Sequence, residues 1–348
     1  MGSTSVKKIR FGSAYANAIS LYTLQSDALI IKIIDYGGII VSVEAPDRQG
    51  RFEDVVLGFD RLDPYISNPA YFGAIIGRYA NRIADARFAL HGREYRLARN
   101  DGKNSLHGGL RGFDKRCWTA QEIEDGIRLT YTSADQEEGY PGNLEVQVTY
   151  TVASNELGIT YSARTDRDTV VNLTNHAYFN LAGHASGDIL GHELQLESDF
   201  FTPCDKDQIP TAVLQSVEGT AFDFRQQRLV GERIMDRNEQ LRIGQGYDHN
   251  WVLRSQASEL RLAARLRDPK SGRALEVLTT EPGIQFYSGN LLDGTLVGKH
   301  GARYRKHAAL CLETQHFPNS PNTPQFPSTE LKAGEQFASE TVYRFLTT

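Results

Sequence analysis

The chain has 348 residues, of which 40% are hydrophobic and 23% are charged, an ordinary composition for a globular protein. It excludes intrinsic disorder, which requires low hydrophobicity and high charge. The formal net charge of −5 argues against a nucleic-acid partner, because such proteins usually carry a basic face. No apolar run approaches the roughly 18 residues that cross a bilayer, so no membrane partner is expected either.

The cysteines predict a protein of the reducing cytoplasm. Cys117, Cys204 and Cys311 are odd in number and far apart in the chain, so neither a disulfide framework nor a cysteine-rich zinc site is expected. The N-terminus has no apolar segment after Lys7 and Lys8, and a signal peptide would need one.

Period-two hydrophobic patterns run along the chain and predict strands. Leu144, Val146 and Val148 alternate with polar residues, as in a half-buried strand. Gly92 follows His91 between two short apolar runs, which indicates a hairpin turn. The predicted strands, in chain order, are 28–34, 38–44, 88–90, 94–97, 127–132, 144–152, 159–163, 260–266 and 341–345.

Helices are few in this prediction, with room for only one or two turns at residues 225–235. Alternating βα units are absent, which excludes a Rossmann fold or a TIM barrel. Strands spaced every 8–12 residues would number roughly 30 and indicate a sandwich or a barrel. No linker divides the chain, so we expect one all-β antiparallel domain over residues 1–348, with residues 1–8 flexible.

The motifs of several enzyme classes are missing from the sequence. There is no G-x-S-x-G nucleophile elbow, no P-loop and no H-E-x-x-H metal pair. Gly244-Gln245-Gly246 lacks the third glycine of a dinucleotide site. We therefore expect a reaction that needs no cofactor and no metal.

Two glycine-rich segments carry groups that suit hydroxyl oxygens. In residues 77–83, Asn81 and Arg82 offer amide and guanidinium donors, although this segment taken alone favours Arg82 as an ordinary surface ion-pair partner. His107 is followed by Gly108 and Gly109, which let the backbone approach closely while the imidazole projects. The alternative for His107 is a ring that bonds only to its own loop.

Three later segments suggest acid–base chemistry on a polyol. His176 lies in an apolar strand-like stretch with regularly spaced amides, where its pKa could be tuned near neutrality. Glu313 ends an apolar strand, and a carboxylate withdrawn from water becomes a better base. Asp248, before His249 and Asn250, could accept sugar hydroxyls. A core histidine, a strand-end glutamate and a turn are the respective alternatives, so these residues alone indicate only a sugar-acting β-protein.

The same segments resemble the aldose 1-epimerase (galactose mutarotase) family. The matching motifs are GRYANRI (77–83), NSLHGG (104–109), RGFD (111–114), EEGYPG (137–142), NLTNHAYFNL (172–181), GYDHN (246–250), QFYSGN (285–290) and LETQ (312–315). Their shared order over most of the chain makes the resemblance specific. Two departures stand out, because Gln136 and Ala212 occupy positions where the family has glycine.

The resemblance implies a large antiparallel β-sandwich, the galactose mutarotase-like supersandwich, that interconverts sugar anomers without a metal. It assigns His176 as the general acid and Glu313 as the general base. The sugar ligands that it implies are Asn81, Arg82, His107, Asp248 and Gln285, with Tyr178 beside the acid.

Two other functions stay open at this point. Asp248 and Glu313 could form the carboxylate pair of a glycosidase, and a carbohydrate-binding module would keep the pocket without the chemistry. The sequence does not select one free aldose, and a charged or modified sugar is an alternative. The only partner expected is a monosaccharide, with the chain as a monomer or a weak homodimer.

Overall fold

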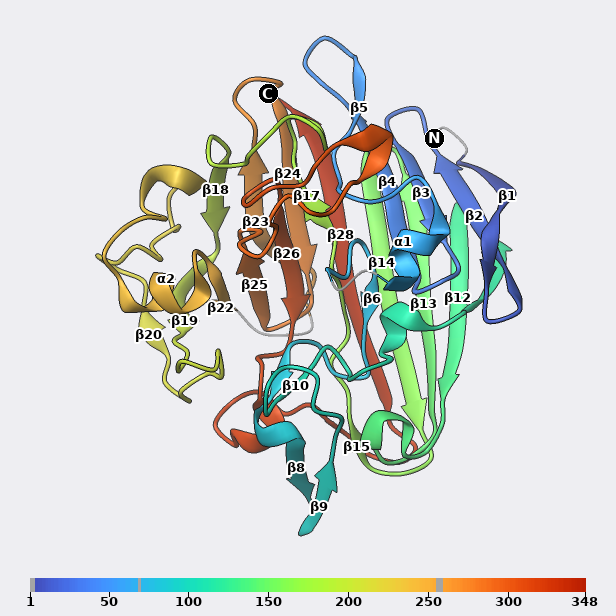
Figure 1. The fold of residues 1–348 in the computed structure, drawn as a ribbon, viewed down its shortest axis with the longest axis vertical. Helices are drawn as coiled ribbons and strands as arrows, with labels where there is room; N and C mark the ends of the chain where they lie inside the picture. Colours follow the sequence, from blue (N-terminus) through green and yellow to red (C-terminus); the bar gives the residue numbers. More distant parts are fainter. Residues whose placement is uncertain (1–3, 68–69, 255–258) are drawn as a thin grey trace.

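The computed structural model describes residues 4–67, 70–254 and 259–348. Its centre is a nine-stranded antiparallel sheet whose long strands run side by side through the middle of the molecule in Figure 1. In spatial order its strands are β11 (Thr119–Ile123), β12 (Gly126–Ser133), β13 (Leu144–Ala153), β14 (Glu156–Thr165), β28 (Gln336–Thr347), β24 (Arg273–Thr279), β23 (Arg261–Arg267), β18 (Glu193–Leu196) and β21 (Arg228–Leu229).

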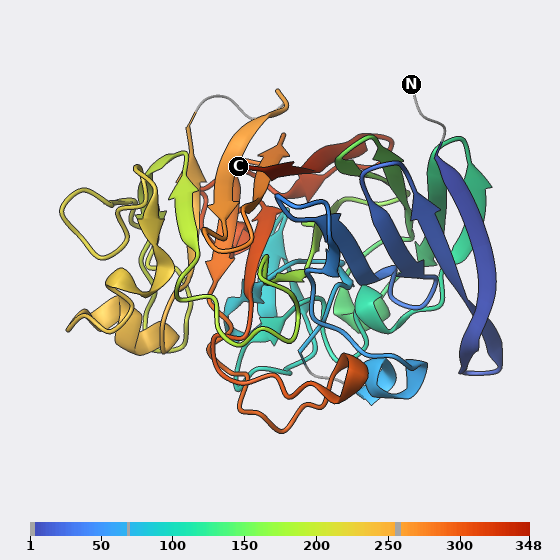
Figure 2. The ribbon, with the colours of Figure 1, turned by 90° about the horizontal axis from the view of Figure 1, so that it is seen from above.

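Two further antiparallel sheets complete the sandwich. A five-stranded sheet contains β1 (Ser5–Ala14), β2 (Asn17–Gln25), β3 (Ile30–Ile34), β4 (Ile39–Pro46) and β5 (Phe52–Asp54). A six-stranded sheet has the order β17 (Tyr178–Phe179), β26 (Leu310–Gln315), β25 (Gly283–Tyr287), β22 (Asp248–Leu253), β19 (Ser198–Thr202) and β20 (Gln215–Ser216). Figure 2 shows the β1–β2 hairpin and the yellow segment that follows β19 at opposite edges of the molecule.

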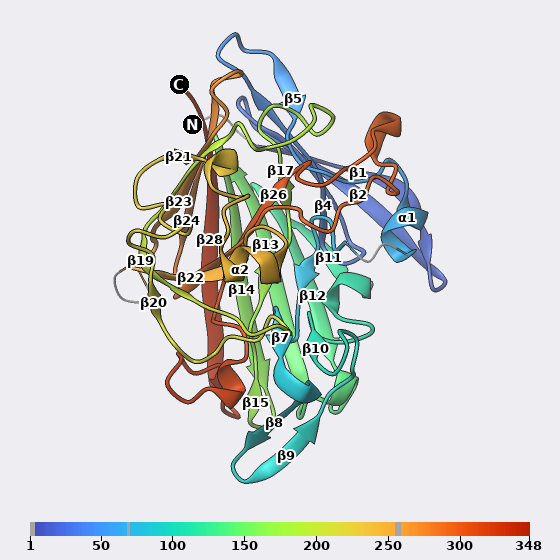
Figure 3. The same ribbon diagram turned by 60° about the vertical axis from the view of Figure 1, so that its left-hand side comes forward.

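Short two-stranded pairs and short helices fill the connections. The pairs are β6 (Ile75–Ile76) with β16 (Thr174–Asn175), β7 (Arg82–Ile83) with β10 (Ser105–Leu106), β8 (Arg87–Leu90) with β9 (Arg93–Arg96), and β15 (Thr169–Val170) with β27 (Glu330–Leu331). The β8–β9 hairpin projects at one end of the molecule (Figure 3). The helices are α1 (Leu62–Ser67), α2 (Glu239–Gly244) and the 3₁₀ segments η1 (Ala84–Ala86), η2 (Phe113–Lys115), η3 (Glu137–Gly139), η4 (Val230–Glu232), η5 (Lys299–Gly301) and η6 (Ser320–Asn322).

The main hydrophobic core joins the three large sheets. Ile31 of the five-stranded sheet, Val148 of the nine-stranded sheet and Trp251 of the six-stranded sheet belong to one buried cluster. Along β13 the buried residues alternate with more exposed ones, because successive side chains of a strand point to opposite faces. This packing of sheet on sheet leaves the polar face of the six-stranded sheet free to build a site.

The predicted antiparallel β-sandwich is confirmed, and so is the hairpin around His91, where β8 pairs with β9. The prediction of a helix at residues 225–235 is wrong in position. That segment holds β21 and the single 3₁₀ turn η4, whereas the α-helix α2 begins later, after Asn238. The Asn238 side chain accepts hydrogen bonds from the backbone N–H groups of Gln240 and Leu241, and such a cap stabilises a helix start.

Residues 5–8, which we expected to be flexible, pair with β2 as the first part of β1. The three cysteines, all in the described part of the chain, are free. Across the described ranges, none of the helices has the length and apolar character needed to cross a membrane.

Candidate functional site

A pocket of about 310 Å³ brings together residues that are far apart in the sequence. It is lined by Asn81, Arg82, His107, His176, Tyr178, Asp248 and Glu313, together with Ala70, Tyr71, Leu106, Tyr287, Leu291, Leu292, Asp293, Thr295 and Leu296. Gln285 does not line it but lies directly behind and is buried, with 3% of its surface exposed. The volume is at the small end of the roughly 300–1,000 Å³ range of ligand pockets, so a small molecule fits best.

The register of strands β22, β25 and β26 brings Asp248 and Glu313 to the same side of the pocket. Gln285 of β25 lies opposite both Asn250 of β22 and Glu313 of β26. Because residues two apart share a face, Asp248 and Asn250 point to the same side of the sheet. The Gln285 amide donates to Asp248 Oδ1 at 2.7 Å, so the register converts three separate motifs into one polar surface.

His176 and Glu313 face each other inside this pocket. His176 lies between the short strands β16 and β17, where its backbone N–H donates to the carbonyl of Ala74 and its carbonyl accepts from the N–H of Gly73. Its Nε2 is 3.7 Å from Glu313 Oε1, and its Nδ1 is 3.5 Å from Cys311 Sγ. The segment is therefore not the single strand expected from its pattern, but two short strands on either side of His176, of which β16 pairs with β6 and β17 pairs with β26.

Burial moves the pKa values of His176 and Glu313 in opposite directions, and the expectation that the pKa of His176 is tuned near neutrality is wrong. Removal from water lowers the pKa of His176 to about 4 and raises the pKa of Glu313 well above its ordinary value, with the nearby Asp248 adding to the rise and Arg82 opposing it. Both effects arise because a low-dielectric environment disfavours charge. Glu313 is 2% exposed and its Oε2 has no hydrogen-bond partner among the described residues. The carboxyl group therefore lines the pocket with an oxygen whose hydrogen-bonding capacity is unused by the described residues.

His107 and Asn81 form the opposite wall. Both residues have left-handed backbone angles, and the backbone N–H of Asn81 donates to His107 Nδ1 at 3.2 Å. A Cβ on Gly108 would lie 1.9 Å from the carbonyl oxygen of Gly77, so this close approach requires glycine, as the sequence indicated. Burial, together with nearby His176 and Arg82, holds the pKa of His107 well below its ordinary value. The ring is therefore neutral, with its hydrogen on Nε2.

Arg82 and Asp248 are held by neighbours that the sequence reasoning missed. Arg82 Nε donates to Asp101 Oδ2 at 2.7 Å, and its Nη2 donates to Gln208 Oε1 at 2.8 Å. Gln208 Nε2 in turn donates to Asp248 Oδ2 at 2.8 Å. Burial raises the pKa of Asp248, although Arg82 and the two amides partly offset the rise. The only sequence signal near these partners was Asp101-Gly102, which predicts a turn and nothing about Arg82.

Aromatic side chains surround the acid–base pair. The ring of Tyr178 stacks on that of His176 with centroids 5.0 Å apart, and Tyr71 stacks on His176 at 5.9 Å. Tyr287 packs edge-on against both His176 and Tyr178. Neither Tyr71 nor Tyr287 was predicted as a site residue, although Tyr287 lies within the QFYSGN motif of residues 285–290. Their apolar faces suit the C–H surface of a ring-shaped ligand.

One nitrogen or oxygen atom each of His107, His176 and Glu313 lies within 4.8 Å of the others, so this set could hold a cation. The tautomer of His107 opposes that use. Its Nδ1 accepts from a backbone N–H, so Nε2 carries a hydrogen and donates, whereas a metal needs a lone pair. The arrangement therefore suits an oxygen ligand better than a metal ion.

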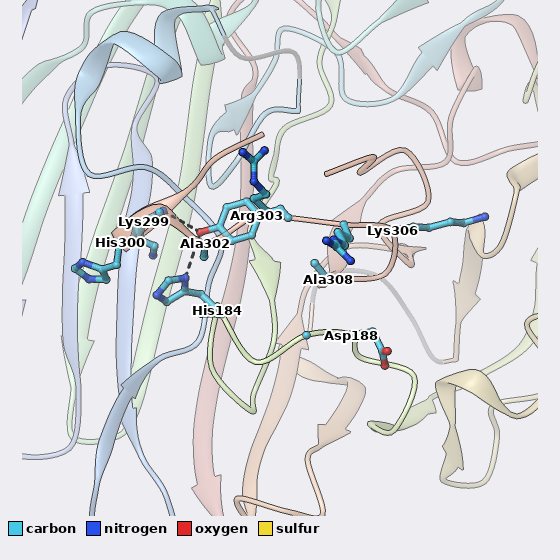
Figure 4. A pocket seen from close by; sticks show the side chains of 13 residues that line it. His184, Asp188, Lys299, His300, Ala302, Arg303, Lys306 and Ala308 are labelled. Carbon is cyan, nitrogen blue, oxygen red and sulfur yellow. Dashed lines mark hydrogen bonds between the residues drawn. The ribbon is translucent and has the colours of Figure 1, made fainter. Parts of the chain in front are cut away.

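A larger cavity of about 750 Å³ lies elsewhere, lined by a basic loop that includes Lys299. In Figure 4 the side chains of His300, Arg303 and Lys306 point in different directions and do not converge on one point. The Lys299 ammonium is already bound by Asp54 and by the carbonyls of Val41 and Val56. This cavity therefore lacks the convergent groups found in the smaller pocket.

Comparisons with known proteins agree with this geometry. The chain matches the sequence model of the family described as "Aldose 1-epimerase" over residues 20–344. It is 49% identical to the galactose mutarotase of Bos taurus over 95% of both chains, and 37% identical to the aldose 1-epimerase of Escherichia coli over 94% of this chain and 95% of that protein.

Solved structures give the same result. The crystal structure of an aldose epimerase homologue from C. elegans superposes with a TM-score of 0.86 at 29% identity, covering 99% of this chain and 100% of that one. A galactose 1-epimerase from Lactobacillus acidophilus also gives 0.86, at 26% identity and 99% coverage of both. The chain belongs to the aldose 1-epimerase family.

Proposed function

We propose that this protein is an aldose 1-epimerase that interconverts the α- and β-anomers of a free aldose such as galactose or glucose. The observation that carries the proposal is the facing pair of His176 Nε2 and Glu313 Oε1, 3.7 Å apart in a pocket of monosaccharide size. The names of the relatives, galactose mutarotase and aldose 1-epimerase, support this choice of substrate class.

The reaction requires one proton donor and one proton acceptor. Glu313 as a carboxylate accepts the proton of the anomeric hydroxyl O1, while His176 as an imidazolium donates its Nε2 proton to the ring oxygen O5. The O1–H electrons form the carbonyl bond, and the C1–O5 electrons pass to O5, so the ring opens to the aldehyde. Rotation about C1–C2 presents the other carbonyl face. Reversal of both proton transfers then closes the ring to the opposite anomer.

The electrostatic setting favours this exchange. Ring opening converts a charged pair, carboxylate and imidazolium, into a neutral pair. Burial raises the pKa of Glu313 and lowers the pKa of His176, so the empty pocket favours the neutral pair and the charged pair that opens the ring is the minor form. In that form Glu313 is a stronger base and His176 a stronger acid than either group would be in water. A positioned acid or base typically contributes about 10²–10⁴-fold to a rate.

The remaining polar groups are assigned to the sugar hydroxyls. Asp248 accepts hydrogen bonds, whereas Arg82, Asn81 and the Nε2–H of His107 donate them. Gln285 supports Asp248 from behind, and Tyr178 covers an apolar face of the sugar. The reaction consists of proton transfers and of cleavage and re-formation of the C1–O5 bond, with no net oxidation or reduction, so the proposal needs no cofactor.

The proposal is tested by polarimetry on freshly dissolved α-galactose, α-glucose, α-xylose and other aldoses. We expect the approach to the equilibrium rotation to accelerate in proportion to enzyme concentration, above the spontaneous rate in buffer. An aryl galactoside serves as the control, because release of the aryl alcohol would indicate a glycosidase instead. If no aldose of the panel equilibrates faster than in buffer, the proposal is refuted.

A further inference from the structure

The loop between β19 and β20 connects two proposed sugar ligands through one side chain. Gln208 accepts from Arg82 Nη2 and donates to Asp248 Oδ2, each at 2.8 Å. Arg82 begins β7 and Asp248 begins β22, two strands of different sheets. The Gln208 amide connects these two side chains by hydrogen bonds. We propose that Gln208 is a positioning residue for sugar binding, an inference that rests on the proposed function of Arg82 and Asp248.

Hydrogen bonds within the loop fix the backbone at Gln208. Asp205 Oδ1 accepts from the backbone N–H groups of Asp207 and Ile209 at 2.9 and 3.0 Å, and the Asp205 carbonyl accepts from the N–H of Gln208 at 3.0 Å. At the neck of the loop, Cys204 and Pro210 form a β-bridge. Gln208 itself has a φ of 57°, a left-handed angle stabilised here by the surrounding turn. The backbone of the loop therefore fixes the position of the Gln208 amide between Arg82 and Asp248.

The chemistry of the contact requires an amide. A side-chain amide can accept from a guanidinium and donate to a carboxylate at the same time. A carboxylate at this position would repel Asp248, and a cation would repel Arg82. Because the amide is neutral, it links the two residues while leaving their opposite charges available to a ligand.

The link completes a two-point support for each ligand. Asp248 receives Gln285 on Oδ1 at 2.7 Å and Gln208 on Oδ2. Arg82 donates to Asp101 through Nε and to Gln208 through Nη2. Gln208 is not one of the described residues that line the pocket, so it acts through Arg82 and Asp248. Preorganised ligands bind more tightly because less order is lost on binding, and the effect belongs in KM rather than kcat.

The test is Gln208→Met, which keeps the length of the side chain and removes both its donor and its acceptor. Hydrogen bonds to charged groups are worth enough to predict a rise of about tenfold or more in KM for anomer interconversion. We expect kcat to change less than about threefold, since Gln208 touches no reacting atom. Calorimetric titration with the sugar should give the same weakening in Kd. Lys206→Met, at an exposed position of the same loop, is the matched control and should leave both constants unchanged.

Each outcome separates this inference from the proposed function. Unchanged KM and Kd in a Gln208→Met protein with wild-type Tm would overturn the positioning role while the epimerase activity stands. A fall in kcat at constant KM would also overturn it, because the residue would then act on the chemistry. A wild-type protein without activity would refute the proposed function, yet the calorimetric comparison would still decide whether Gln208 supports sugar binding.

Discussion

Replacement of Glu313 by glutamine tests the proposed base most directly. The change keeps the shape of the side chain and removes the group that accepts the O1 proton. Glu313 is almost completely buried, and its Oε1 lies 3.7 Å from His176 Nε2, so the substitution removes the carboxyl group that faces the proposed acid. Loss of a general base should lower kcat at least about 10²-fold, which is about 2.7 kcal/mol of transition-state stabilisation at 1.36 kcal/mol per tenfold.

Sugar binding should change far less than the rate. The new amide can still hydrogen-bond O1, so KM should stay within about threefold, the signature of an interaction made mainly in the transition state. The variant should also fold well. Glu313 as a buried carboxyl group already favours its uncharged form, and an uncharged amide avoids the cost of burying a charge.

The assay is polarimetry of fresh α-galactose at several sugar concentrations, with the spontaneous rate subtracted from each measurement. Glu335→Gln, at an exposed loop position, is the matched control and should behave as the wild type. A Glu313→Gln protein with near-wild-type kcat would remove Glu313 from the role of base. Asp248 would then be the next candidate, and a glycosidase-like arrangement of carboxylates would need testing.

Three further predictions concern binding, pH and metal. Asp248→Asn should raise KM by about tenfold with a smaller change in kcat, because it weakens an acceptor of sugar hydroxyls; a pure loss of kcat in polarimetry would contradict this. Glu281, 2.6 Å from His316, opposes the effect of burial and raises the pKa of His316 above its ordinary value. The contribution of this pair to the free energy of unfolding is therefore complete below the unfolded pKa of about 6.5 and is lost as pH rises through the folded pKa of His316. The loss amounts to about 1.4 kcal/mol for each unit by which the folded pKa exceeds the unfolded pKa. Urea unfolding should show this loss in the wild type and not in His316→Gln, and equal pH profiles would refute it. Dialysis against a chelator should leave anomer interconversion unchanged, and a loss of activity restored by a divalent ion would refute the metal-free proposal.

Local patterns in the sequence predicted nine strands of the structure, five of them in the nine-stranded sheet, but not β1, β2 or most of the short strands. The alternation at Leu144, Val146 and Val148 corresponds to β13, since one buried face dictates period two regardless of the partner strand. The family motifs also identified seven of the residues that line the pocket, but not Tyr71, Tyr287 or the residues between 291 and 296. The helical prediction was misplaced because α2 has only six residues, and helices that short depend on tertiary packing more than on sequence pattern.

The two departures from the family pattern show how sequence and structure meet. Gln136 and Ala212 stand where the resemblance led us to expect glycine, and both adopt left-handed angles, with φ of 67° and 65°. That conformation favours glycine, so the backbone angles at both turns agree with the residue type that the resemblance led us to expect.

What only the tertiary structure decided is the pairing of groups from distant segments. Whether His176 meets Glu313 depends on the bridges that hold residues 174–179 beside β26, and no local pattern records that contact. The same holds for Asp101 and Gln208, which reach Arg82 from two different loops. A turn sequence specifies the local backbone, whereas the partner of its side chain is set by how the loops pack on the sheets.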